Sequence, residues 1–345
     1  MTVSIIIPVY NVAPYIEACL ESVMRQTYGG QMECIIVDDC GTDDSIAIAE
    51  RMIAVYQGHI QFRMLHHERN RGLSAARNTG TKAATGDYIY YLDSDDEIAE
   101  DCIEKLMAVA LKDPEVEMVQ GNGRTDGRWM MEYGRGHTES DCYIKVYPKK
   151  YLTSNEEVRT WYYHKKQIPV YAWNKLIKRS FLIDHHLLFK EGILYEDLLW
   201  LFYFFKYVRS VGLVSGITYL HKRRPGSIMT GTDKKTEAYH RGVIFRDIIT
   251  HLTPEHEIEE YRYYCMFYAN HYFHLAHCSL AFRETYPLYW RKAWQLKCYD
   301  IGAKLAVSYV LGRFEGGYKV YEGLRKLKRW GASRIRLSRS LSGTR

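Results

Sequence analysis

Acidic residues follow two of the apolar runs in the first hundred residues. Asp38 and Asp39 come after one run, and residues 93–96 (DSDD) come after another. Carboxylates gathered at one place repel each other unless a cation joins them, and hard oxygen ligands suit Mg²⁺ or Mn²⁺. Such an ion binds one or two carboxylates plus substrate phosphates, and it neutralises the charge developing on a diphosphate leaving group. Asp93 and Asp95 are therefore the predicted metal ligands; the alternative is that these acids only cap helices and face solvent.

Aromatic and basic residues stand close to the same positions. Tyr10 could stack on a nucleobase, although a tyrosine after a strand more often packs in the core. Asp39 could accept a hydrogen bond from the edge of that base. Arg71 and Arg77 could either neutralise phosphate or pair with the clustered acids, and the residues alone leave both roles open.

Alternating strand and helix patterns must position these residues. Apolar runs predict strands at residues 3–8, 34–37, 60–66, 88–92 and 116–120. Amphipathic spacing predicts helices between them, after Pro14, at residues 45–56 and 73–84, and from about Glu100. Repeated strand–helix units imply an α/β fold with a doubly wound, mostly parallel sheet, whose ligands bind outside the carboxyl ends of the strands. The acids, Tyr10 and the arginines should therefore converge on one edge of the sheet.

The pattern changes after residue 120. Residues 121–143 are rich in glycine and charge and are typical of a loop. The segments from about Tyr151 are predicted to be helical, and nearly everything beyond Lys235 is predicted to be helical as well. The mostly parallel sheet should thus be followed by a helical C-terminal region.

Composition limits the class of protein. A hydrophobic share of 47% and a charged share of 26% indicate a globular chain. The eight cysteines form no CxxC pair, which disfavours a disulfide framework and fits a reducing cytosol. We find neither a signal-peptide pattern nor the run of about 18 apolar residues that a membrane span requires. These features predict a cytoplasmic protein.

Four segments in order resemble glycosyltransferase family 2. They are residues 4–11 (SIIIPVYN), 36–39 (IVDD), 70–78 (NRGLSAARN) and 92–96 (LDSDD). The resemblance resumes at residues 172–176 (AWNKL) and 191–197 (EGILYED). Each motif is moderately specific, and the order of the first four makes the resemblance strong.

The resemblance implies a GT-A fold and an inverting, hexosyltransferase-type enzyme that uses a nucleotide-sugar donor, UDP being the commonest nucleotide. We expect a transferase domain at residues 1–230, with a donor half at about 1–120 and an acceptor half at about 121–230. Residues 231–345 would form the helical region. The expected acceptor is a glycan or a lipid-linked hydroxyl compound, in the synthesis of surface polysaccharide, capsule or lipopolysaccharide.

The resemblance also assigns roles to individual residues. Pro8, Tyr10 and Asp39 would line the nucleoside pocket, with Arg71 or Arg77 beside it. Asp93 would touch ribose or metal, Ser94 would lie with the donor, and Asp95 would bind the metal that bridges the diphosphate. The expected cofactor is Mn²⁺ or Mg²⁺.

Asp197 would be the general base, with Glu196 as its neighbour or substitute. In a single displacement the acceptor hydroxyl loses its proton as it attacks the anomeric carbon, and a nearby carboxylate can take that proton. The alternative is that both acids only complement a helix dipole, because they precede an apolar run.

Aromatic residues and one loop have further expected roles. Trp173 is the expected sugar platform, whereas Trp200 lies in an apolar helix and should be core. Residues 223–228 (RRPGSI) resemble the family's loop that closes over the donor, in which Arg224 would grip the diphosphate. A solvated charged loop is the alternative.

Two features lie in the C-terminal region. His271, His274 and His277 could bind a metal, although their aromatic surroundings favour packing. Residues 319–345 carry nine Lys/Arg against one acid, interleaved with apolar residues, which is typical of a helix on an anionic membrane surface. A peripheral position on the inner face of the membrane would follow, and a solvated tail is the alternative. Nucleic acid is not an expected partner, because the rest of the chain is not basic.

Rival functions lack their motifs. A sugar-nucleotide pyrophosphorylase needs a basic, glycine-rich loop after the first strand, and residues 10–14 (YNVAP) contain neither residue type. A dehydrogenase would need the motif G-x-G-x-x-G, which is absent from this sequence. An inactive nucleotide-binding scaffold is the remaining alternative, and the acids at Asp95 and Asp197 argue against it.

Overall fold

The computed structural model describes residues 1–125, 142–143, 147, 149–165, 167–222, 231–276 and 278–312. The chain divides into two compact units, Met1–Gly231 and Thr232–Arg345. The first unit contains all the described strands and the acids singled out above. The second contains only helices among its described elements.

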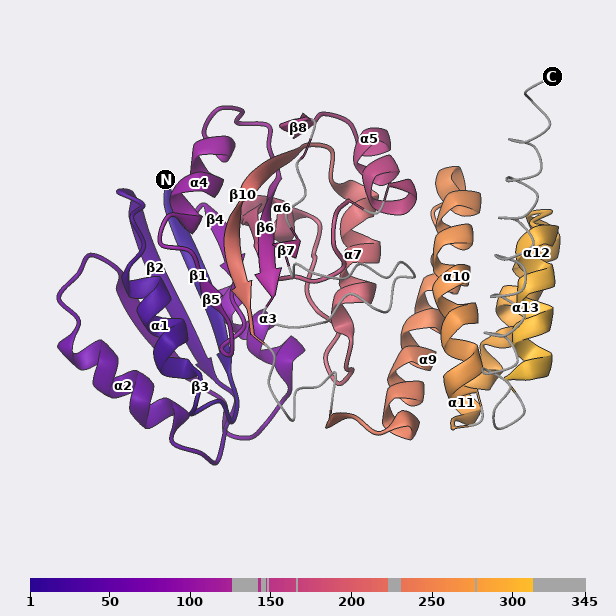
Figure 1. Cartoon of the computed structure of the whole chain (residues 1–345), viewed down its shortest axis with the longest axis horizontal. Helices are drawn as coiled ribbons and strands as arrows, with labels where there is room; N and C mark the ends of the chain where they lie inside the picture. The colour runs from indigo at the N-terminus through magenta and orange to yellow at the C-terminus, as the bar shows by residue number, and fades with distance from the viewer. Residues whose placement is uncertain are drawn as a thin grey trace, which may run out of the picture. The chain divides into compact units, whose positions relative to one another are not determined.

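The first unit contains one mixed sheet in the order β3-β2-β1-β4-β9-β6-β10-β5, with β7 beside β6 and β8 beside β10. Its longest ladders are parallel, namely β1 with β2, β2 with β3 and β6 with β10. Figure 1 shows these strands between helices (Figure 1). The strands are β1 Thr2–Val9, β2 Gln31–Asp38, β3 Gln61–His66, β4 Tyr88–Tyr91, β5 Glu97–Ile98, β6 Met118–Thr125, β7 Cys142–Tyr143, β8 Tyr151–Leu152, β9 Lys175–Lys178 and β10 Val211–His221.

The helices of this unit cover both faces of the sheet. Alternate side chains of a strand point to opposite faces, and Val3, Ile5 and Ile7 of β1 pack in a core cluster with residues of α1 and α4. Ile6 points the other way, toward α3, where a Cβ on Gly80 would lie 2.4 Å from Ile6 Cγ2. The helices are α1 Ile16–Met24, α2 Ser45–Val55, α3 Leu73–Ala83, α4 Cys102–Ala110, α5 Asn155–Arg159, the π-helix η1 Thr160–His164, α6 Arg179–Asp184 and α7 Glu196–Tyr207.

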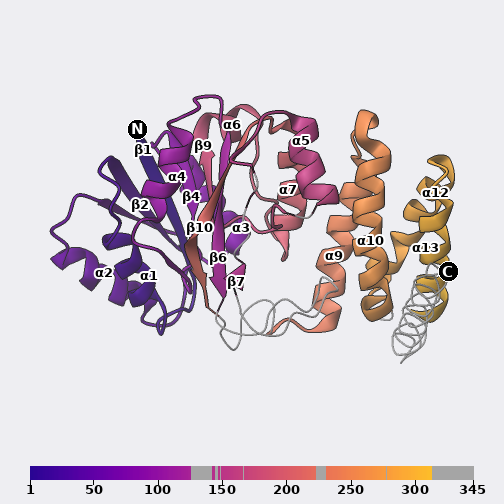
Figure 2. The same ribbon diagram turned by 45° about the horizontal axis from the view of Figure 1, so that its top comes forward.

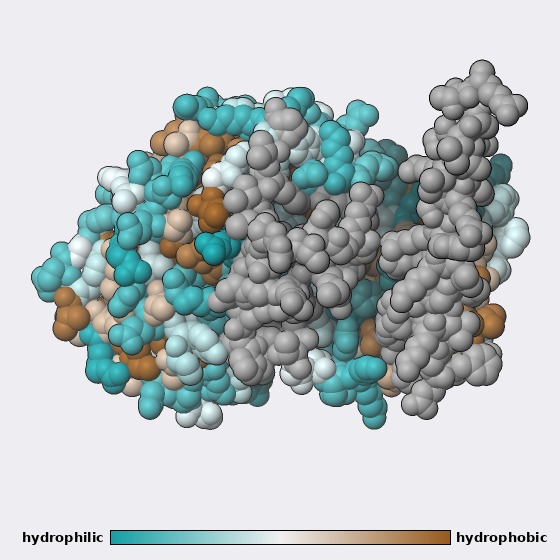
Figure 3. Space-filling model, viewed as in Figure 1, coloured by the Kyte–Doolittle hydropathy of each residue, from teal (hydrophilic) through white to brown (hydrophobic). Residues whose placement is uncertain are grey.

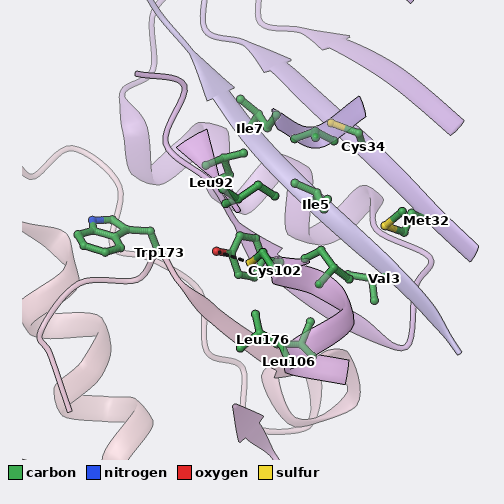
Figure 4. Close-up of a cluster of buried hydrophobic side chains, with 14 of the residues drawn as sticks. Val3, Ile5, Ile7, Met32, Cys34, Leu92, Cys102, Leu106, Trp173 and Leu176 are labelled. Atoms are coloured by element: carbon green, nitrogen blue, oxygen red, sulfur yellow. Dashed lines mark hydrogen bonds between the residues drawn. The ribbon is translucent and has the colours of Figure 1, made fainter. Parts of the chain in front are cut away.

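The core cluster explains why β1 forms its strand. Seven successive residues, from Val3 to Val9, are buried, as expected for a parallel strand covered on both faces. Figure 4 shows Val3 near Cys102 and Leu106, and Ile7 farther along the strand near Leu92 and Cys34 (Figure 4). On the outside, hydrophilic residues predominate over the coloured surface of α1, α2 and the neighbouring strands, with single apolar residues among them (Figure 3).

The expected α/β fold and helical C-terminal region are confirmed, but the prediction of helices from about Tyr151 was wrong in part. The antiparallel strand β9 joins β4 to β6, and the eleven-residue β10 pairs with β6 (Figure 2). β9 has only four residues, and β10 contains Gly212 and Gly216 together with a register shift. Neither strand therefore carries the regular alternation that identifies strands in a sequence.

The second unit is a group of helices. Among its described residues are α9 Lys234–Thr250, η2 Pro254–His256, α10 Glu257–Leu275, α11 Leu280–Glu284, α12 Tyr286–Gln295 and α13 Tyr299–Leu311. α10 packs against both α9 and α13, and α12 packs against α13 (Figure 1). Tyrosines such as Tyr261, Tyr268 and Tyr289 are fully buried at their centre, where Tyr268 and Tyr289 stack at 4.4 Å. Within the described parts of the chain, no helix is long and apolar enough to cross a membrane.

Candidate active site

One edge of the sheet gathers the residues that could do chemistry. β1, β2, β3 and β4 are parallel and end at Val9, Asp38, His66 and Tyr91. β10 points the same way as β4, because the two antiparallel pairings through β9 restore the direction and β6 is parallel to β10. The carboxyl ends of β1, β2, β3, β4, β6 and β10 therefore lie on the same side of the sheet. The residues after each strand meet there, as ligand sites of parallel sheets require.

Arg77 is the centre of the site. It belongs to α3 and is almost fully buried. Its Nη1 donates to Glu196 Oε1 (2.7 Å) and Asp197 Oδ1 (2.9 Å), and its Nη2 donates to Asp93 Oδ1 (2.8 Å). The ring of Phe189 lies 5.2 Å from the guanidinium carbon. Arg77 thus joins the acids of the β4 end to the acids that open α7.

These contacts choose between the two roles that the sequence left open for Arg77. Its guanidinium pairs with the clustered acids and is shielded from solvent, so it is not a free phosphate ligand. Of the two roles left open for Arg77, the structure shows the pairing with the clustered acids. Burial alone would lower the pKa of Arg77, but Asp93, Asp197 and Glu196 raise it above its ordinary value.

Arg77 is the cation that the carboxylates of Asp93, Glu196 and Asp197 share, and we call these four residues the Arg77 hub. Burial raises the pKa of Glu196 to about 7, the neighbouring Asp197 raises it too, and Arg77 opposes both effects. Burial likewise raises the pKa of Asp197, again against the lowering effect of Arg77. Near neutral pH the pair Glu196–Asp197 therefore readily accepts a proton, which is the property needed in a general base.

Asp197 is the better placed of the two acids. Its side chain is 22% exposed, whereas that of Glu196 is 4% exposed. Oδ2 of Asp197 accepts a hydrogen bond from the Ala172 amide (3.2 Å), and Oδ1 accepts from Arg77, so the carboxylate is fixed from two sides. Both acids stand in the first turn of α7, which follows Tyr195 in the left-handed conformation (φ 62°).

The four residues after β4 have different surroundings. Asp96 is buried, and it accepts hydrogen bonds from the Tyr219 hydroxyl (2.6 Å) and the Lys222 amide (2.7 Å). His221 Nδ1 lies 3.0 Å from the same carboxylate. Burial raises the pKa of Asp96 to about 6, although His221 opposes this. Asp96 therefore ties the end of β10 to the β4 end and belongs to the framework.

Asp93 and Asp95 remain as possible metal ligands, while Ser94 between them is buried. Asp93 uses Oδ1 for Arg77, and its side chain is partly exposed. Two partly exposed carboxylates fit Mg²⁺ or Mn²⁺, which take most of their remaining ligands from substrate phosphates and water. Among the residues that the structure describes, no group of three or more His, Cys, Asp or Glu side chains is arranged to hold a metal by itself.

Asp39 supports the neighbouring loop. Its Oδ1 accepts from the Arg71 amide (2.8 Å) and its Oδ2 from the Gly72 amide (2.8 Å), and His67 Nδ1 lies 2.6 Å from Oδ1. Gly72 has φ 86°, a conformation that favours glycine, and leads directly into α3. The carboxylate that was expected to meet a base edge thus also holds the loop in front of α3.

The other donor residues lie around this loop. Pro8 is buried in β1, and Tyr10 is exposed just beyond the end of that strand. The Arg71 guanidinium is partly exposed and donates to Glu191 Oε2 (3.0 Å). Arg224 lies outside the described residues.

Asn78 is a residue whose role the sequence did not reveal. Its Nδ2 donates to the Phe189 carbonyl and its Oδ1 accepts from the Phe189 amide, both at 2.8 Å. These two bonds fix the segment before α7 to α3, one residue after Arg77. Asn78 stood in a family motif, but its partner is 111 residues away, so no local signal identified it.

Trp173 does not offer a platform for a sugar. Its ring is stacked on Tyr171 (3.4 Å) and on Tyr219 (4.3 Å). Two rings this close and nearly parallel cannot share one face of an indole, so they cover both faces. In this structure Trp173 therefore links the segment before β9 to Tyr219 of β10, with no ring face open to a sugar. Figure 4 shows Trp173 at the margin of the core cluster (Figure 4).

Trp200 and the C-terminal histidines were also singled out. Trp200 is buried and donates from Nε1 to the Leu187 carbonyl (3.0 Å), which confirms that it is core. His271 Nδ1 is hydrogen-bonded to the Phe267 carbonyl. The side chain of His274, residue His277 and the basic tail lie outside the described residues.

Comparison with known proteins identifies the class of protein to which this site belongs. The family model "Glycosyl transferase family 2" matches residues 4–182, which is more than half of the chain. The chain therefore belongs to glycosyltransferase family 2 and is a glycosyltransferase.

Individual relatives agree with this assignment. The chain is 31% identical over 267 residues to the putative glycosyltransferase EpsH of Bacillus subtilis, covering 75% of this chain and 72% of EpsH. Its fold is similar to that of residues 1–349 of S. aureus TarS in complex with UDP-GlcNAc, with a TM-score of 0.64, 19% identity, and 91% and 90% of the two chains covered. It is also similar to the mannosyltransferase PcManGT of Pyrobaculum calidifontis in complex with GDP-Man and Mn²⁺ (TM-score 0.52, 16% identity, 92% and 82% covered). At these identities the solved structures establish the shared fold.

Proposed function

We propose that this glycosyltransferase moves a sugar from a nucleotide diphosphate sugar, with UDP as the favoured nucleotide, to a hydroxyl acceptor. The reaction would be a single inverting displacement with Asp197 as general base. The observation that carries the proposal is the Arg77 hub, in which one buried guanidinium contacts both Asp93 after β4 and Asp197 at the start of α7. A donor held at the β4 end would thereby lie beside the base.

The proton and the electrons move as follows in this proposal. The acceptor oxygen attacks the anomeric carbon from the face opposite the diphosphate, and the bond from that carbon to the phosphate oxygen breaks. The nucleoside diphosphate leaves with the electron pair. Asp197 takes the acceptor's proton, and the elevated pKa of the Glu196–Asp197 pair favours this transfer near neutral pH.

Asp93 and Asp95 would hold Mg²⁺ or Mn²⁺ together with the donor. The ion, when bound, would neutralise negative charge on the departing diphosphate. The chemistry of two partly exposed carboxylates supports this role, and so does the presence of Mn²⁺ with GDP-Man in the PcManGT structure. Ser94 would belong to the same donor site as part of the backbone turn between the two acids.

The nucleoside would lie against the ends of β1 and β2. Exposed Tyr10 offers a ring for stacking. Pro8 is buried in β1, and Asp39 lies beside the end of that strand, where its amide donates to the Val9 carbonyl (2.9 Å). Arg71 is the accessible cation for phosphate, in place of Arg77, and Arg224 would be a second. The TarS structure with UDP-GlcNAc supports UDP as the first nucleotide to test.

The acceptor would be a glycan or a lipid-linked hydroxyl compound in surface polysaccharide synthesis. Peripheral contact of the basic tail with the inner face of an anionic membrane would bring the enzyme to such an acceptor.

Calorimetric titration tests the donor site. Purified full-length protein is titrated with UDP, GDP, CMP and dTDP, with and without Mn²⁺. We expect Mn²⁺-dependent binding of one nucleotide, its loss in Asp95→Ala, and its retention in Asp101→Ala, a control that removes an exposed acid paired with Lys105 on the neighbouring helix. Binding of none of the four nucleotides in the presence of metal would refute the proposed donor, and binding without any sugar transfer would favour an inactive scaffold.

A further inference from the structure

The last described helix, α13, carries apolar residues on two opposite sides. Ile301 and Leu305 are buried on the side that faces the other helices of the second unit. Tyr299, Val307 and Val310 lie on the other side and are between 42% and 56% exposed. Their spacing, with exposed Ala303 between them, places them in one row along the helix.

The charged residues of α13 do not interrupt this row. Asp300 accepts two hydrogen bonds from Arg262 of α10 (3.0 and 2.8 Å), and Lys304 Nζ lies 3.2 Å from Asn270 Oδ1 of the same helix. Both charges of α13 are therefore directed to α10. Surface helices normally place polar residues on their outer side, so an uncharged outer row indicates a partner that is itself apolar.

Trp294 extends the row beyond the helix. It is 57% exposed near the end of α12, and its ring centroid lies 5.3 Å from that of Tyr299. Tryptophan and tyrosine are the side chains enriched where apolar and aqueous phases meet, because each has an apolar body and a polar group. We call Trp294, Tyr299, Ala303, Val307 and Val310 the α13 stripe.

The positive charge of the chain is concentrated in the part of the sequence that includes this stripe. Residues 286–345 contain fourteen Lys/Arg against three Asp/Glu, a net charge of +11. Because the whole chain carries +6, residues 1–285 carry −5. An anionic surface would attract the end of the chain that holds the stripe and repel the remainder, which orients the molecule.

We propose that the α13 stripe is a membrane-contacting surface that enters the headgroup region of an anionic lipid bilayer. α13 would lie in the plane of the interface, with Trp294 and Tyr299 at the headgroup level and Val307 and Val310 below them. The flanking basic residues, Arg291 and Lys297 among them, bind the lipid phosphates. Binding of this kind scales with the apolar area buried and with the charge of the lipid.

Vesicle sedimentation with the full-length protein tests this surface. The probes are vesicles of phosphatidylcholine with a quarter phosphatidylglycerol, and vesicles of phosphatidylcholine alone. We expect at least tenfold stronger partitioning into the anionic vesicles. The double variant Val307→Glu, Val310→Glu should lose at least tenfold of this partitioning, because two charges would enter the interface. The control is Ile258→Glu on α10, an equally exposed apolar residue (53%) outside the stripe, which should stay within twofold of the wild type.

Three results would overturn the proposal. Unchanged partitioning of the double variant would mean that the basic tail binds lipid without the stripe. If the double variant binds vesicles as the wild type does but has a smaller mass in solution by light scattering, the stripe is a contact between copies of the chain. Equal losses in the double variant and in Ile258→Glu would mean that added negative charge alone weakens binding. If circular dichroism shows that the double variant is unfolded, Trp294→Ser replaces it, with the same tenfold loss expected and an unchanged affinity refuting the proposal.

Discussion

Arg77→Met should destabilise the first unit in a way that depends strongly on pH. The variant leaves Asp93, Glu196 and Asp197 without the cation that they share. Removing one partner of a buried ion pair costs about 3–5 kcal/mol. For a unit of this size that corresponds to a fall of roughly 6–20 °C in the unfolding temperature.

The sign of the pH dependence follows from the carboxylates. In alkaline solution, above the raised pKa of Glu196 (about 7), the loss of Arg77 is felt fully. As the pH falls, the raised pKa values of Glu196 and Asp197 favour their protonated forms, and the repulsion between them weakens. The difference between variant and wild type should therefore be largest at alkaline pH and smallest in acid.

Thermal unfolding followed by circular dichroism at pH 5, 7 and 8.5 measures this difference. Arg179→Met is the control, because the guanidinium of Arg179 donates from Nε to a backbone carbonyl of the same unit, that of Gly86 (2.7 Å). The loss of this arginine should lower stability without the pH dependence that arises from Asp93, Glu196 and Asp197. An equal effect of Arg77→Met at pH 5 and pH 8.5 would refute the account of the hub.

Three further variants test neighbouring parts of the structure. In the wild type, stability should fall as the pH rises from about 4.5 to 7, because the raised pKa of Glu196 lets the folded chain bind a proton that the unfolded chain has released. Glu196→Gln should remove this fall, which amounts to on the order of 3 kcal/mol. Denaturant unfolding across this pH range measures it. Asn78→Ala should cost about 1–3 kcal/mol through its two bonds to Phe189 and should lower kcat more than donor affinity, as kinetics would show. Trp173→Ala should cost about 3–5 kcal/mol in unfolding experiments with nucleotide affinity unchanged, whereas weakened acceptor binding alone would restore the platform interpretation.

The first half of the fold could be predicted because each buried strand is a continuous apolar run. Residues 3–8 and 88–92 were expected as strands, and the structure has Thr2–Val9 and Tyr88–Tyr91. In the second half of the sheet, β6 (Met118–Thr125) overlaps the strand expected at residues 116–120, but β9 and β10 could not be predicted. β9 is short, and β10 includes exposed Ser215 and Gly216 where its pairing with β6 shifts. Their strand state depends on pairing with distant partners and not on local pattern.

The candidate site was predicted in its residue types but not in all its contacts. Asp93, Glu196 and Asp197 were singled out, yet the partner they share, Arg77, was assigned to the donor. Arg77 reaches Asp197 across 120 positions of sequence, so only the fold reveals that contact. The ring contacts of Trp173 could not be predicted for the same reason, since Tyr219, which covers one of its faces, lies on a strand that the sequence did not predict.

The most direct test of the proposed catalysis compares Asp197→Asn with the wild type in two measurements, nucleotide affinity by titration and the rate at which nucleoside diphosphate is released from the sugar donor. General-base catalysis contributes about 10²–10⁴-fold to a rate. We therefore expect Asp197→Asn to lose at least a hundredfold in rate, to keep its nucleotide affinity within about twofold, and to lose more rate than Glu196→Gln. An Asp197→Asn variant that binds nucleotide and releases diphosphate at the wild-type rate would contradict the assignment of Asp197 as the base.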